Sequence, residues 1–204
     1  IALNLRIQRI RARLHEKREA LAQALAVNRE LATRDELTGL ANRRAMQDLM
    51  DLERRRSQRS GRPMVLAQLD IDHFKKLNDT YGHAEGDRAI QEIGHILSGA
   101  LVANSVAIRM SGDEFMVLIR HGSEEIMDKT CAAIEQRVQR YNAAAPAGSF
   151  QLSFSTGVAK YEGGSVEKFL VELDERMYAE KRAFHAARNG HAVPEQGNAP
   201  SISE

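Results

Sequence analysis

Apolar residues recur at alternating spacings of three and four along the first 34 residues, a stretch without glycine or proline. The positions that keep this rhythm are Leu3, Ile7, Ile10, Leu14, Leu21 and Leu31. The rhythm is that of a coiled-coil seam, although Lys17, Ala24 and Asn28 interrupt it, and a polar asparagine there sets the register at a cost in stability. We predict a helix over 1–34 that forms a parallel dimer with a second copy. The alternative is an amphipathic helix packed on its own domain.

The rest of the chain alternates between helical and strand patterns. Helical spacing predicts helices over about 42–57, 73–79, 83–101, 123–142 and 165–190. Apolar or alternating runs predict a strand at 64–72, a hairpin within 107–120 and a strand at 149–161. This order predicts an α/β (α+β) sandwich: a βαββαβ core with an antiparallel central sheet flanked by helices, preceded by the long N-terminal helix.

Composition narrows the class of protein. Of 204 residues, 43% are hydrophobic and 28% are charged, as in a soluble globular domain with one appended element. A net charge of +1 gives no case for nucleic acid as a partner, although it leaves nucleotides open. One cysteine, Cys131, excludes an intrachain disulfide and a cysteine-rich zinc site, and no apolar run is long enough to span a bilayer. We therefore expect a cytoplasmic location.

The two ends of the chain suggest how it is organised. It begins at Ile1 rather than Met, so we expect a longer protein with a sensor domain upstream, and that protein can be anchored in a membrane. Residues 191–204 contain proline, glycine and serine and are expected to be disordered. The predicted units are the helix over 1–34, a globular domain over 35–190 and the tail over 191–204.

Acidic residues end two of the predicted strands. Asp113 and Glu114 lie in the hairpin turn, and adjacent carboxylates repel each other unless a cation is near, although a solvated turn explains the hairpin taken alone. In a βαββαβ unit the central strands are neighbours, so Asp70 is expected beside this turn. Carboxylates and a backbone carbonyl near Ile71 suit Mg²⁺, which usually bridges such groups to substrate phosphates. The lysine pair at 75–76 follows within a helical turn and can reach phosphate oxygens.

Five stretches resemble, in order and spacing, the GGDEF family of diguanylate cyclases. They are RDELTGLANRR, LDIDHFKKLNDTYGHAEGD, RMSGDEF, STGVA and DERMYAEK, and together they cover about 33–190. The resemblance implies a nucleotidyl-cyclase-like palm that condenses two GTP molecules into cyclic di-GMP and releases pyrophosphate. It also implies one GTP in each domain and two domains face to face, which a homodimer through the N-terminal helix would provide.

The resemblance assigns a metal site. Asp70 and the carbonyl of Ile71 match metal ligands, and Asp113 matches the metal-binding acid that also accepts the proton of the 3′-hydroxyl. Glu114 matches its supporting neighbour, and Gly112 keeps the backbone small beside the nucleotide. The implied ion is Mg²⁺, with Mn²⁺ as an alternative.

Other matched positions imply contacts with GTP. Asn78 and Asp87 match the residues that read guanine, because an amide and a carboxylate pair with its edge while adenine would leave buried polar groups unpaired. His83 matches a further substrate contact. Lys75 and Lys181 match residues that stabilise phosphate charge.

The sequence departs from the family pattern at three places. The first glycine of the signature turn is Ser111, which is tolerated if its φ stays negative. The product-inhibition motif Arg-x-x-Asp is absent, because Val102 and Ser105 stand at its charged positions. The last helix is longer than usual, so Arg182 and Arg188 are both candidates for a phosphate-binding arginine.

Because every acid, amide and lysine position is present, the leading interpretation is an active cyclase output domain. The alternative is a catalytically weak or inactive GGDEF module that binds GTP or protein partners. A third interpretation, a palm acting on another substrate, is disfavoured because Asn78 and Asp87 favour guanine.

Overall fold

The computed structural model describes residues 2–146 and 148–189. Its helices are α1 (Ala2–Thr33), α2 (Arg43–Ser60), α3 (Phe74–Tyr81), α4 (His83–Ala100), α5 (Glu124–Ala144) and α6 (Val166–Asn189). Its strands are β1 (Ala41–Asn42), β2 (Met64–Ile71), β3 (Ser105–Ser111), β4 (Glu114–Arg120) and β5 (Phe154–Tyr161). Each predicted helix and strand is present. The tail predicted to be disordered lies outside the described residues.

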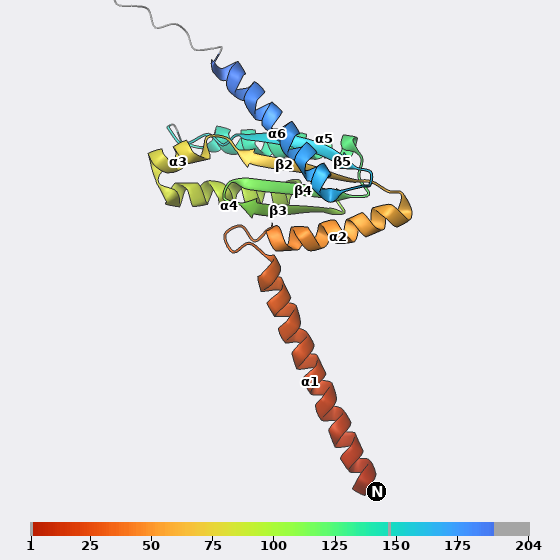
Figure 1. The fold of residues 1–204 in the computed structure, drawn as a ribbon. Helices are drawn as coiled ribbons and strands as arrows, with labels where there is room; N and C mark the ends of the chain where they lie inside the picture. The colour runs from red at the N-terminus through yellow and green to blue at the C-terminus, as the bar shows by residue number, and fades with distance from the viewer. Residues whose placement is uncertain (1, 147, 190–204) are drawn as a thin grey trace, which may run out of the picture.

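The first helix projects away from the rest of the molecule (Figure 1). Its large apolar side chains are exposed over most of its length, from Ile10 at 51% to Leu31 at 74%. Leu14 and Leu21, which lie in the predicted seam, are 55% and 61% exposed. The alternative of a helix packed along its own domain is therefore wrong, and the apolar seam is available to a partner.

The five strands form one sheet in the order β1-β3-β4-β2-β5. All neighbouring strands are antiparallel except β1, which runs parallel to β3. Strand β2 lies between β4 and β5 and is buried along its whole length, as its continuous apolar run predicts. The expected βαββαβ core with its antiparallel sheet is confirmed, with β1 as an addition at one edge.

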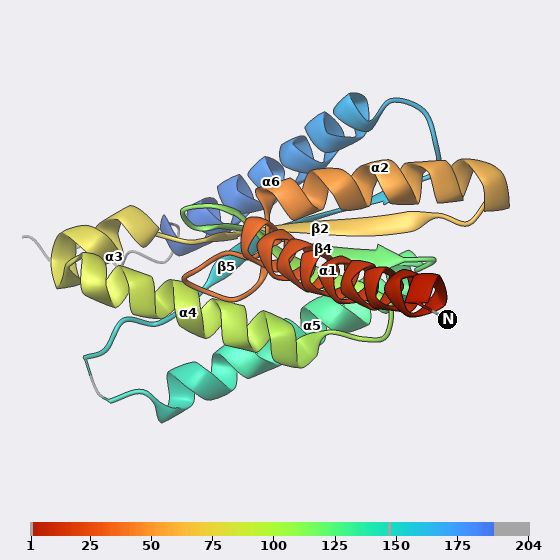
Figure 2. The ribbon, with the colours of Figure 1, turned by 90° about the horizontal axis from the view of Figure 1, so that it is seen from below.

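Helices cover both faces of the sheet, as Figure 2 shows. Side chains alternate between the faces of β2 because successive residues of a strand point to opposite sides. Val65 and Leu69 join the core under α4 and α5. Met64 and Leu66 join the core under α2 and α6. The sheet is thus held in a three-layer sandwich.

Two details differ from the sequence prediction. Strand β1 was not predicted, because two residues are too few to give a periodic signal. Strand β5 starts at Phe154 rather than near 149, because the side chain of Asn142 binds the backbone N–H and C=O of Leu152 at 2.8 and 2.7 Å. That contact holds the segment before β5 against α5. Within the described residues, none of the helices is long and apolar enough to cross a membrane.

Candidate active site

The acidic end of β2 meets the turn between β3 and β4. Asp70 is the register partner of Glu114, and the Ile71 N–H donates to the Asp113 carbonyl at 3.2 Å. Gly112 has a φ of 40°, a conformation that L side chains rarely adopt, so the turn needs glycine there. The predicted juxtaposition of these acids, which rested on the adjacency of two central strands, is confirmed.

A lysine from the last helix reaches the same place. Lys181 Nζ lies 2.6 Å from Asp70 Oδ1, although the two residues are 111 positions apart. Burial opposes the charge of Lys181, but its hydrogen bond to Asp70 and the nearby acids raise its pKa overall. For Asp113 the effect of burial has the opposite sign: burial raises the pKa of this carboxyl, and the charges of Asp70 and Glu114 raise it further. The site therefore combines one ammonium with several crowded carboxylates.

Ser111, the departure from the family signature, fits its position. Among the described residues, the non-glycine residues with positive φ are His73, Asn104 and His121, so Ser111 does not need the freedom of glycine. Its hydroxyl donates a hydrogen bond to Glu114 Oε2 at 2.6 Å. The serine thus restrains an acid of the site instead of crowding it.

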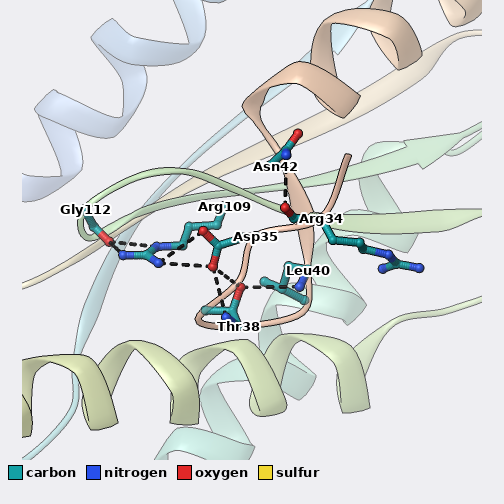
Figure 3. Close-up of polar contacts among 7 residues, drawn as sticks. All are labelled: Arg34, Asp35, Thr38, Leu40, Asn42, Arg109 and Gly112. Atoms are coloured by element: carbon teal, nitrogen blue, oxygen red, sulfur yellow. Dashed lines mark hydrogen bonds and ion pairs between the residues drawn. The ribbon is translucent and has the colours of Figure 1, made fainter. Parts of the chain in front are cut away.

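An arginine fastens the turn to the segment that joins α1 and α2 (Figure 3). Arg109 Nη1 lies 3.1 and 3.2 Å from the carboxylate oxygens of Asp35, while its Nε and Nη2 donate to the Gly112 carbonyl at 3.1 and 3.0 Å. Asp35 also accepts bonds from the N–H and hydroxyl of Thr38. Burial opposes the charge of Asp35, but these bonds lower its pKa overall. Sequence reasoning did not assign this link, although Asp-x-x-Thr is a recognisable local turn signal.

The positions expected to contact guanine lie on α3 and at the start of α4. Asn78 Oδ1 is buried and has no hydrogen-bond partner within the described residues. A Cβ at Gly86 would lie 1.9 Å from that oxygen, so a side chain at position 86 would displace the Asn78 amide. Asp87 follows directly on the exposed side of α4, and His83 begins that helix. A buried polar atom without a partner is costly, and the Asn78 oxygen can accept a hydrogen bond.

The other predicted phosphate contacts are less constrained. Lys75 is exposed on α3. The guanidinium of Arg182 stacks over the ring of Tyr178 at 4.9 Å. The side chain of Arg188, the other candidate, lies outside the described part of the chain.

A further residue, Asp72, was missed by the sequence analysis. It is fully buried, and its Oδ1 accepts a hydrogen bond from Ser155 Oγ at 2.7 Å. Its N–H donates to the Ser153 carbonyl at 3.0 Å. These bonds tie the turn after β2 to the start of β5 and so fix the backbone that carries Asp70. The spacing Asp-x-Asp at the end of an apolar strand was the available signal.

The donors at the turn fit a hard divalent ion. Asp70, Asp113 and the Ile71 carbonyl offer oxygen atoms, which Mg²⁺ and Mn²⁺ prefer. Burial is the main reason that the pKa of Asp113 is raised, and the charges of Asp70 and Glu114 add a repulsion that a cation relieves. Within the described residues no three acid, histidine or cysteine side chains are gathered to form a complete cage. This is consistent with an ion that takes its remaining ligands from a phosphate substrate.

Comparisons with known proteins agree with this geometry. A family model described as "Diguanylate cyclase, GGDEF domain" matches residues 32–186. The chain is 33% identical over 178 residues to the diguanylate cyclase DgcP of Pseudomonas aeruginosa, covering 83% of this chain and 26% of DgcP. It is 31% identical over 158 residues to the diguanylate cyclase DosC of Escherichia coli, covering 76% of this chain and 34% of DosC.

A solved structure is similar over almost the whole chain. The coiled coil and GGDEF domain of DgcB from Caulobacter crescentus, in complex with c-di-GMP, superimposes with a TM-score of 0.73 at 29% identity. The match covers 90% of this chain and 96% of that one. The fold and site define a nucleotidyl-cyclase-like palm. The chain belongs to the GGDEF family of diguanylate cyclases, and it spans 26% and 34% of the lengths of the two curated relatives.

Proposed function

We propose that this chain is the diguanylate cyclase output domain of a longer protein and condenses two GTP molecules into cyclic di-GMP with release of pyrophosphate. The observation that carries the proposal is the register of Asp70 with Glu114, with Asp113 at the adjoining turn. Three acids beside a lysine suit phosphoryl transfer, in which positioning and electrostatic stabilisation supply most of the rate.

Asp70, Asp113 and the Ile71 carbonyl would hold the divalent ion, Mg²⁺ or Mn²⁺, as cyclases of this family use divalent metals. Such an ion supplies neutralising charge at the reacting phosphates. Asp113 would accept the proton of the 3′-hydroxyl, the role that the resemblance to the family implies for it. Lys181 and Lys75 would balance the charge of the triphosphate.

Guanine would be read by Asn78 and Asp87, with His83 as a further contact. The unpaired Oδ1 of Asn78 supports this role, because an amide oxygen accepts a hydrogen bond that a guanine N–H can donate. Adenine has an unprotonated N1 and a C2–H where guanine has N–H donors, so it would leave an acceptor at that edge unsatisfied, and sites of this kind reject the wrong base strongly.

One domain would hold one GTP, so the reaction needs two domains face to face. The exposed apolar side chains of α1 support a parallel coiled-coil homodimer as the means of bringing them together. The domain organisation that we propose is therefore a dimerising helix over 1–34, a cyclase domain over 35–190 and a tail, placed downstream of a sensor.

The test is direct. The purified chain is incubated with GTP or ATP and Mg²⁺, and products are separated by chromatography. We expect cyclic di-GMP from GTP and no comparable product from ATP. Binding of GTP without any product would favour the alternative, a module that binds GTP or protein partners. Equal use of ATP would contradict the assignment of Asn78 and Asp87.

A further inference from the structure

The proposed metal ligand Asp70 already has a cationic partner in this fold. Lys181 Nζ lies 2.6 Å from Asp70 Oδ1, and the two side chains are 29% and 11% exposed, so water screens the pair only in part. The charges of Asp113 and Asp72 also act on Lys181. The Lys181 ammonium therefore occupies a position where several carboxylates would also attract a metal cation.

We propose that Lys181 is the resident counter-ion of the metal site: it neutralises Asp70 while the nucleotide is absent and transfers to the triphosphate when GTP enters. Asp70 is then free to bind the divalent ion. The proposal rests on the cyclase function above and adds an order of events to it.

The physical reason is competition for one carboxylate oxygen. An ammonium at hydrogen-bond distance and a divalent ion repel each other, so each weakens the binding of the other at Asp70 Oδ1. A triphosphate offers Lys181 several oxygen acceptors and more negative charge than one carboxylate, which makes the transfer favourable. Metal and nucleotide must then bind with positive coupling, and each raises the affinity for the other by the same factor.

The experiment measures binding of Mn²⁺ alone to the nucleotide-free chain, from the loss of the free-ion electron paramagnetic resonance signal. We expect Lys181→Met to bind Mn²⁺ about tenfold more tightly than wild type, a factor within the usual range of coupling between sites. Lys181→Arg keeps the positive charge and should bind Mn²⁺ as weakly as wild type. Circular dichroism checks that each variant is folded.

Two controls separate competition at Asp70 from a general effect of charge. Lys75→Met removes a nearby exposed lysine and should leave Mn²⁺ affinity unchanged. In an Asp70→Asn background the effect of Lys181→Met should vanish, because the carboxylate charge for which Lys181 and the ion compete is gone. A similar gain from Lys75→Met, or a gain that persists without Asp70, would overturn the proposal.

The result is also distinguishable from failure of the proposed function. If wild type makes cyclic di-GMP but Lys181→Met gains no affinity for Mn²⁺, the counter-ion role is wrong and the cyclase function stands. If wild type binds no GTP and makes no product, the proposed cyclase function is wrong. The proposed transfer of Lys181 from Asp70 to the triphosphate is then wrong as well.

Discussion

The hydroxyl of Ser111 donates a hydrogen bond to Glu114 Oε2 at 2.6 Å, across the turn that carries the acidic signature. Glycine at this position could not make that contact. Glycine would give the turn more backbone freedom, whereas the serine side chain restrains Glu114 through this hydrogen bond. Because Glu114 is also the register partner of Asp70, the restraint acts on the acidic site itself.

We predict that Ser111→Ala lowers the rate of cyclic di-GMP formation by about two- to tenfold, the range that corresponds to the loss of one ordinary hydrogen bond. Initial rates at saturating GTP measure the effect. Ser60→Ala is the matched control, because that hydroxyl bonds the Arg56 carbonyl at the end of α2 and should not affect the rate. An unchanged rate for Ser111→Ala would show that the contact does not position Glu114.

Asp113→Asn should abolish product formation and at the same time stabilise the metal-free fold near neutral pH. Because the folded-state pKa of Asp113 lies above its usual 3.8, this carboxyl favours the folded state when protonated, and that contribution is lost as the pH rises through the folded pKa. Asparagine mimics the neutral carboxyl, so Asp113→Asn should melt at a higher temperature than wild type near neutral pH. This difference in melting temperature should shrink as the pH falls towards 3.8, because Asp113 itself then becomes protonated.

Thermal melts without metal across this pH range test the second half of that prediction, and chromatography of products tests the first. Asp79→Asn, an exposed acid on α3, is the control and should change neither quantity appreciably. Wild-type turnover by Asp113→Asn would refute its catalytic assignment. If Asp113→Asn were less stable than wild type at neutral pH, the ionised Asp113 carboxylate would not be disfavouring the folded state.

The contacts that the sequence predicts best are those that follow from strand order. Asp70 meets Glu114 because continuous apolar strands with a short turn leave few registers for the hairpin and its neighbour. The pair of Lys181 and Asp70 spans 111 positions and depends on how α6 docks on the sheet, which no local pattern encodes. The same holds for Arg109 and Asp35, 74 positions apart.

Local competition explains the remaining differences. The segment before Phe154 alternates like a strand, but the backbone groups of Leu152 are taken by the Asn142 side chain. Because these backbone groups bond a side chain instead of a neighbouring strand, β5 starts later than the sequence pattern predicts. The Asp-x-Asp spacing marks Asp72, but the burial of Asp72 does not follow from it, because acids at the end of a strand are usually exposed to solvent.

Leu14→Asp should weaken self-association and lower activity with it. The side chain is 55% exposed in the single chain, so the substitution leaves the fold of one chain intact. In a paired seam the charge would be buried without a partner, which is strongly unfavourable. Sedimentation at concentrations on the order of tens of micromolar measures the association. Wild type found as a monomer there would contradict the dimer, and Glu16→Gln, an exposed change outside the seam, is the control.

Product should accumulate without strong non-competitive inhibition, because the positions of the family's inhibitory motif cannot bind it. Val102 offers neither charge nor hydrogen bond, and the Ser105 hydroxyl already donates to the Val102 carbonyl at 2.6 Å. Nearby Arg109 cannot replace the missing arginine, since its guanidinium is committed to Asp35 and Gly112. An arginine and an aspartate are what a guanine edge and a phosphate would require.

Initial rates against added cyclic di-GMP, together with calorimetry while a GTP analogue fills the substrate site, measure this expectation. Only weak competition at the GTP site should remain in wild type. The double variant Val102→Arg, Ser105→Asp restores the motif on the same backbone and should gain non-competitive inhibition, which makes it the positive control. Tight binding of cyclic di-GMP to wild type with the GTP site filled would mean that other residues bind the product, and the inference from Val102 and Ser105 would then be wrong.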